Sequence, residues 1–90
     1  MADINFTEFM AETAKSAKTV EMPDGRVIEL PPIELAPDSF FEAAKENDHV
    51  GMVRSLIGED QYAMWVGAGA NALTLLTMYA KVYNVTLPNS

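Results

Sequence analysis

The charges of this 90-residue chain stop almost completely after Asp60. All 13 acidic residues lie between Asp3 and Asp60, and Lys81 is the only charged side chain from residue 61 to residue 90. An uncharged stretch of this length is stable either across a membrane or packed inside a protein. Its glycines, threonines and asparagines, and its lack of a long run of Leu, Ile and Val, favour two buried helices over a membrane span.

Composition narrows the classes of function. The chain has no cysteine, which excludes disulfides, thiolate metal sites and a cysteine nucleophile. Its six basic residues are too few to bind the phosphate backbone of a nucleic acid, and a net charge of −7 disfavours binding to anionic membrane surfaces. We therefore expect a basic or apolar protein partner, without nucleic acid or membrane. The start Met1-Ala2-Asp3 has neither the basic nor the apolar block of a signal peptide.

The first 18 residues form a separate segment. The run from Asn5 to Glu8 has a capping side chain followed three residues later by a glutamate, the pattern of a helix start. Phe6, Phe9 and Met10 then lie on one helical face. Because so short a helix is marginal alone, segment 1–18 is predicted to be a docked helix or an arm that stays mobile until a partner binds.

A β-hairpin is predicted over residues 19–30. The turn signal is Pro23-Asp24-Gly25, in which proline presets φ and glycine accepts a positive φ. β-branched residues flank it, which favours strands near 19–22 and 26–30. A lone two-stranded hairpin is barely stable, so its apolar face must rest on helices. That face comprises Val20, Met22, Ile28 and Leu30.

Residues 31–38 form an extended connector, and a bundle of about four short helices is predicted over 39–85. Ser39 and Glu42 have capping-box spacing for the first of these helices. Asp48 and Asn71 are candidate caps of later helices, and Gly58 suits a helix end. The fold class is thus mainly α, with a hairpin near the N-terminus, and residues 19–90 form one small domain.

Three further patterns define the expected inward faces and breaks of the bundle. Counting the helix predicted in segment 1–18 as the first, the third helix carries Val50, Val53, Leu56 and Ile57. The fourth begins at Glu59 and Asp60 and carries Tyr62, Trp65 and Val66, and the fifth carries Leu73, Leu76, Tyr79, Ala80 and Tyr83. The run 67–69, Gly-Ala-Gly, ends the fourth helix. Asn84 and Pro88 mark the end of the fifth.

Asp38-Ser39-Phe40 is the one motif that could be an attachment site for a prosthetic group. Acyl carrier proteins are small, acidic and helical, and carry their group on the serine of an Asp-Ser-Leu motif at a helix start. Here the helix stops at Asn47, and a hairpin stands where a carrier has a long helix. A helix cap is the better interpretation of Ser39, so no cofactor is expected.

The chain lacks the groups of residues that catalysis and metal binding need. His49 is the only histidine, whereas a metal cluster typically needs three or four ligands. The few serines have no nucleophile-elbow glycines nearby. Glu59 and Asp60 are adjacent and point to different sides of a helix, so they suit its dipole rather than an acid–base pair. We expect a binding protein and not an enzyme, with no catalytic residue and no metal ligand.

The stretch 30–85 resembles a known phage family. It contains Leu30-Pro31-Pro32, Leu35-Ala36-Pro37, Phe41-Glu42-Ala43-Ala44 and a run from Val53 to Tyr62. That run, Val-Arg-Ser-Leu-Ile-Gly-Glu-Asp-Gln-Tyr, is similar to the "Leu-Leu-Gly-Asp/Glu-x-Gln-aromatic" segment of siphophage tail assembly chaperones. These are the class of the lambda G and G-T proteins.

The resemblance implies a chaperone of bacteriophage tail assembly. Such proteins hold the tape-measure protein while tail-tube subunits assemble around it, act in the host cytoplasm and are absent from the mature virion. The tail-tube subunit is a second candidate partner, and a monomer or weak homo-oligomer is expected. The hypothetical client groove comprises Tyr62, Trp65, Leu76 and Tyr79, rimmed by Glu59. A generic phage or bacterial interaction module, structural or regulatory, is the alternative, and an acyl-carrier-like protein ranks third.

Overall fold

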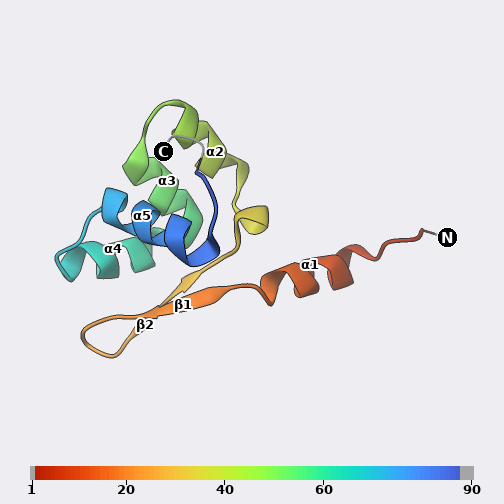
Figure 1. Ribbon diagram of the computed structural model, residues 1–90, viewed down its shortest axis with the longest axis horizontal. Coiled ribbons are helices and arrows are strands. Elements are labelled where there is room, and N and C mark those ends of the chain that lie inside the picture. The colour runs from red at the N-terminus through yellow and green to blue at the C-terminus, as the bar shows by residue number, and fades with distance from the viewer. Residues whose placement is uncertain (1, 88–90) are drawn as a thin grey trace.

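The computed structural model describes residues 2–87 (Figure 1). Its elements in chain order are α1 (Phe6–Ala14), β1 (Lys18–Glu21), β2 (Val27–Leu30), the short 3-10 helix η1 (Ile33–Leu35), α2 (Asp38–Lys45), α3 (His49–Ile57), α4 (Glu59–Gly67) and α5 (Ala72–Tyr83). The predicted mainly α fold, with a hairpin near the N-terminus followed by four short helices, is confirmed. The expected end signal at Pro88 lies outside the described residues.

The hairpin has the predicted buried face. β1 and β2 pair antiparallel with Val20 opposite Ile28, so alternate side chains of both strands face the helices. Ile28 and Leu30 are fully buried, and β2 packs against α3. The strands are 18–21 and 27–30 because Met22 and Arg26 belong to the tight turn, where the Met22 amide donates to the Arg26 carbonyl at 2.7 Å.

Gln61 fastens the outer edge of β2 to the helices. Its Oε1 accepts from the Glu29 amide at 2.7 Å, and its Nε2 lies 3.3 Å from the Glu29 carbonyl. The same Nε2 donates to the Ile57 carbonyl at the end of α3, at 2.8 Å. One side chain therefore supplies the pairing that a third strand would give, and it fixes the hairpin against the α3–α4 junction.

Three predicted side-chain caps are confirmed. Asn5 accepts from the Glu8 amide at 2.9 Å, Asp48 from the Gly51 amide at 2.9 Å and Asn71 from the Thr74 amide at 2.8 Å. Each bond satisfies an amide that has no partner in the first turn of its helix. Gly58 ends α3 with φ at 87°, a conformation that glycine adopts without steric cost.

The capping box predicted at Ser39 is wrong. α2 begins two residues earlier than predicted, at Asp38, and its N-cap is Pro37 with φ −70° and ψ 161°. The proline ring already fixes the extended entry, so Ser39 lies exposed inside the first turn. No side-chain bond caps this helix. α2 also ends at Lys45 rather than Asn47, because Asn47 turns the chain with φ at 58°.

The core lies between the hairpin face and helices α2, α3 and α5. Its largest fully buried side chains are Tyr79, Phe40, Ile28, Leu30, Met52, Leu75, Val53 and Pro32. Three residues placed on inward stripes, Val50, Val66 and Leu73, are exposed instead. α5 has apolar residues on more than one face, and the buried face is set by Ala72, Leu75 and Tyr79. None of the helices within residues 2–87 is long and apolar enough to cross a membrane.

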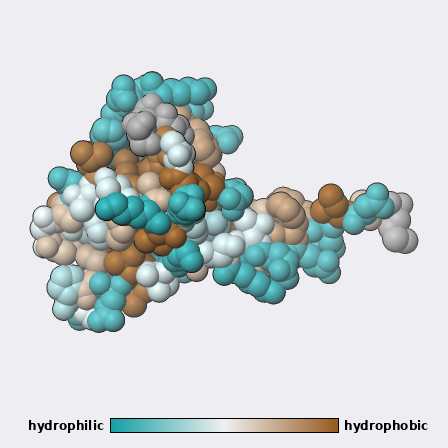
Figure 2. Space-filling view, viewed as in Figure 1, coloured by the Kyte–Doolittle hydropathy of each residue, from teal (hydrophilic) through white to brown (hydrophobic). Residues whose placement is uncertain are grey.

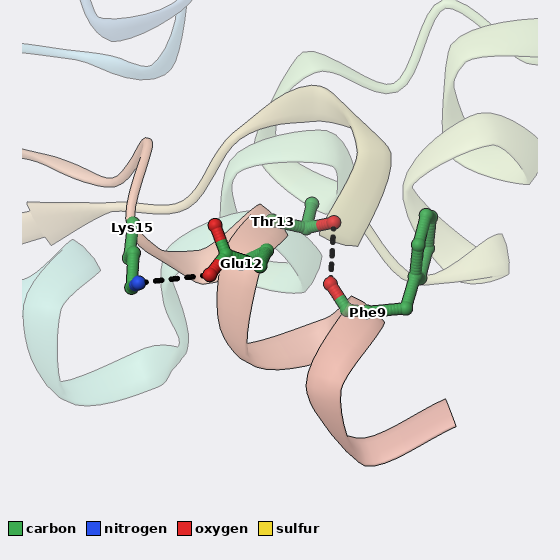
Figure 3. Close-up of polar contacts among 4 residues, drawn as sticks. All are labelled: Phe9, Glu12, Thr13 and Lys15. Carbon is green, nitrogen blue, oxygen red and sulfur yellow. Dashed lines mark hydrogen bonds and ion pairs between the residues drawn. The ribbon is translucent and has the colours of Figure 1, made fainter. Parts of the chain in front are cut away.

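α1 projects from the body like an arm (Figure 1). Its nearest neighbour is η1, and no residue of α1 is buried. Ile4 and Phe6 are each 74% exposed and Phe9 is 58% exposed. Figure 3 shows the ring of Phe9 pointing away from the Lys15–Glu12 ion pair of 2.9 Å. The predicted helix is therefore present, with its apolar face open to solvent.

Candidate protein-binding groove

Two of the residues predicted to line a client groove belong to the core. Trp65 is buried, and its Nε1 donates to the Asn71 carbonyl just before α5, at 2.7 Å. Tyr79 is fully buried, and its hydroxyl donates to the Pro31 carbonyl at 2.6 Å. Burial raises the pKa of the Tyr79 hydroxyl well above its usual value of 10.0. Both rings thus find backbone acceptors inside the fold and offer no contact surface to a partner.

The other three predicted residues lie in two places. Glu59 is exposed and forms an ion pair with Arg54, Nε to Oε1, at 2.9 Å. The Arg54 guanidinium also lies 5.5 Å from the centre of the half-buried Tyr62 ring, a cation–π contact. Leu76, on α5, is nearly buried yet lines a surface pocket. The five residues therefore do not share one accessible surface.

The accessible apolar surface follows α5 instead. A pocket of about 280 Å³ opens between α3 and α5 and is lined by His49, Met52, Leu73, Leu76, Thr77, Ala80, Lys81 and Leu87. An adjoining hollow of about 650 Å³ is lined by Asn71, Leu73, Thr74, Thr77, Met78, Lys81 and Val82. The two share Leu73, Thr77 and Lys81, which form a ridge at i, i+4 spacing. We call the two hollows and this ridge the α5 groove.

The chemistry of the α5 groove suits an apolar side chain. Leu73 is 57% exposed, whereas Met52 and Leu76 form a buried floor. The Thr77 hydroxyl donates to the Leu73 carbonyl at 2.9 Å, so its hydrogen bond is made within the helix. Figure 2 shows apolar surface gathered over the helical body beside hydrophilic side chains. An open concave apolar surface of this kind is typical of binding sites.

Electrostatics separate the groove from the rest of the surface. Lys81 is the only charged residue after Asp60, so α4 beyond its first turn and all of α5 contribute no acid. Lys81 lies at the rim and forms no ion pair within residues 2–87. The groove is thus a nearly uncharged strip, with one cation, on an acidic protein.

A third hollow, near the hairpin turn, is more polar. It measures about 330 Å³ and is lined by Met22, Pro23, Asp24, Arg26, Ala63, Met64, Gly67 and Ala68. Hydrogen bonds from the Arg26 amide and guanidinium lower the pKa of the Asp24 carboxyl. Arg26 Nε and Asp24 Oδ2 lie 2.6 Å apart, so these charges already satisfy each other. This hollow is a weaker candidate for partner binding.

Within residues 2–87, no group of three His, Asp or Glu side chains is placed to hold a metal ion. Comparison with protein-family models, with curated protein sequences and with solved structures returned no match to this chain. Of the residues that line the α5 groove, sequence reasoning named only Leu76 as a groove residue. The available signal was the apolar character of α5 on the side away from its core stripe.

Proposed function

We propose that this chain is a tail assembly chaperone of a bacteriophage, a non-catalytic protein that holds a helical segment of the tape-measure protein in the host cytoplasm. The α5 groove is the observation that carries the proposal, because it is apolar, open and nearly uncharged. The tape-measure protein is proposed as the client because residues 30–85 resemble siphophage tail assembly chaperones. The chaperone leaves before the virion is complete.

Helix-in-groove binding supplies the physical mechanism. An amphipathic client helix places apolar side chains at i, i+3, i+4 and i+7 against a hydrophobic groove. Leu73 lines both hollows and lies beside the buried Met52 in the first, whereas Met78 and Val82 line the second hollow. Each buried apolar anchor contributes about 1.5–3 kcal/mol, from which the cost of association is subtracted. Weak and reversible binding follows, which suits a chaperone that must be displaced.

Co-expression with the tape-measure protein tests the proposal. We expect the client to be soluble and to co-purify with the wild-type chain. Leu73→Glu puts a charge on the exposed ridge and should abolish co-purification. Val27→Glu, at an exposed position on the hairpin outside the groove, is the matched control and should retain it. A client that is insoluble with the wild-type chain, or that binds the Leu73→Glu variant equally well, contradicts the proposal.

The alternative is an interaction module with a different helical partner. The groove is compatible with this alternative, because an apolar lining selects a helix by its shape and not by its sequence. Affinity capture from phage-infected cells separates the two: recovery of the tape-measure protein supports the chaperone. Groove-dependent recovery of another single protein, lost in Leu73→Glu and kept in Val27→Glu, supports the alternative.

A further inference from the structure

The arm formed by residues 2–14 and the Leu73 ridge of the α5 groove are both exposed apolar surfaces. Ile4, Phe6 and Phe9 are mostly exposed and Met10 is 36% exposed, although α1 is a regular helix with an Asn5 cap. A nine-residue helix is marginal in water and gains most of its stability from packing its apolar face. The exposed apolar face of α1 is thus available to pack against another surface.

The arm does not reach the groove of its own chain. The Lys18 amide, just after the arm, donates to the Tyr83 hydroxyl at 3.0 Å. Tyr79 and Tyr83 lie on the face of α5 that meets the hairpin and connector, through bonds to Pro31 and Leu30. Thr77 and Lys81 are two residues from these tyrosines and so point to nearly the opposite side of the helix. The arm therefore joins the body on the hairpin side of α5, opposite the groove. Figure 1 shows the arm extending away from the body.

Charge favours a second copy at the groove. Residues 2–17 carry three acids, Asp3, Glu8 and Glu12, against one base, Lys15. Glu12 is paired with Lys15, which leaves Asp3 and Glu8 to meet a cation. Two chains of net charge −7 repel each other over most of their surface. The groove is the strip where that repulsion is smallest, and Lys81 at its rim offers the complementary charge.

We propose that the chain self-associates by seating the α1 arm of one copy in the α5 groove of a second copy. The phenyl rings of Phe6 and Phe9 and the Met10 side chain lie along the ridge, over the pocket between α3 and α5. Asp3 or Glu8 pairs with Lys81. Reciprocal exchange of two arms gives a closed dimer, and one-way exchange gives longer chains of copies. A client helix competes with the arm for the same surface.

Association of the full chain, without any client, tests this proposal. Light scattering after size-exclusion chromatography, supported by sedimentation equilibrium, measures the molar mass across the micromolar to submillimolar range. We expect dimers or longer oligomers for the wild-type chain. The double variant Phe6→Glu/Phe9→Glu and the single variant Leu73→Glu should each weaken association by roughly tenfold or more. Val27→Glu should associate as the wild-type chain does. Circular dichroism checks that each variant is folded.

Mixing the two variants identifies the contact. The Phe6→Glu/Phe9→Glu chain keeps an intact groove, and the Leu73→Glu chain keeps an intact arm. An equimolar mixture should therefore form one-to-one pairs, although each variant alone is monomeric. A wild-type chain that stays monomeric, arm variants that associate normally, or a mixture that forms no pairs each overturns the proposal. Because no client is present, these results are independent of the co-purification test.

Discussion

The hydroxyl of Tyr83, in the last turn of α5, donates a hydrogen bond to the carbonyl of Leu30 at the end of β2. The same hydroxyl accepts from the Lys18 amide at 3.0 Å, so one side chain joins the final helix to both strands. Tyr79 makes the neighbouring bond to Pro31. The two rings lie 4.8 Å apart, centre to centre. This tyrosine pair holds the hairpin on α5 and leaves the opposite side of the helix free for the groove.

Tyr83→Phe should lower the free energy of unfolding by about 1–2 kcal/mol, because the Leu30 carbonyl and the Lys18 amide both lose a partner while the ring still packs. Urea denaturation followed by Trp65 fluorescence measures this. Val82→Ala changes an exposed neighbour on the same helix turn and should have a much smaller effect. Equal losses for the two variants would show that the tyrosine hydroxyl contributes nothing specific.

Stability should fall in alkaline solution because of the same two tyrosines. Burial raises the pKa of Tyr79 and of Tyr83 above the usual 10.0. Above pH 10 the unfolded chain releases these protons while the folded chain retains them, so the unfolded state gains stability as pH rises. The stabilisation is complete below pH 10 and is lost above it. The double variant Tyr79→Phe/Tyr83→Phe should flatten this decline in denaturation curves; an unchanged slope would contradict the assignment.

Gln61→Ala should destabilise the fold by about 1–3 kcal/mol, since it removes the hydrogen bonds to Glu29 and Ile57. Hydrogen exchange of the Glu29 amide should speed up more than exchange of amides in α5. Asp60→Ala, at the exposed neighbouring position, is the control and should cost only a few tenths of a kcal/mol. If exchange of the Glu29 amide is unaffected by Gln61→Ala, the Gln61 side chain does not hold β2 against the helices.

The helix starts near Ser39 and Asp48 should respond differently to truncation of these two side chains. Asp48→Ala removes the bond to the Gly51 amide and should cost about 1 kcal/mol. Ser39→Ala removes no capping bond, because Pro37 begins α2, and should change stability by less than about 0.5 kcal/mol. Thermal unfolding of the two variants makes the comparison. A larger loss for Ser39→Ala would restore Ser39 as the cap.

Local signals in the sequence were sufficient for the hairpin and most helix ends. The Pro23-Asp24-Gly25 turn and the caps Asn5, Asp48 and Asn71 act through bonds between near neighbours, so their residue types predict them. Ser39 failed because two valid signals compete there, and the fixed φ of Pro37 prevailed. A capping pattern does not show which of two nearby residues precedes the first turn of the helix.

The candidate site was harder to predict because it depends on which face of α5 is buried. Leu73, Leu76 and Tyr79 all fit helical spacing, yet Leu73 lies outside and Tyr79 lies in the core. The orientation is set by Tyr79 reaching Pro31, a contact 48 residues away in sequence. Trp65 was placed both on an inward helix face and in the hypothetical client groove, and its indole N–H donates to the Asn71 carbonyl inside the fold. A long-range acceptor such as the Pro31 carbonyl has no sequence signature.

Methyl NMR with a client peptide tests the central claim most directly. The Phe6→Glu/Phe9→Glu variant keeps the α5 groove free of a second copy, and overlapping peptides of the tape-measure protein are added to it. We predict that one amphipathic peptide shifts the methyl signals of Met52, Leu73, Leu76 and Leu87, and that Leu73→Glu removes these shifts. Shifts confined to Met22 and Met64 near the hairpin turn, or no shifts with any peptide, would contradict the account.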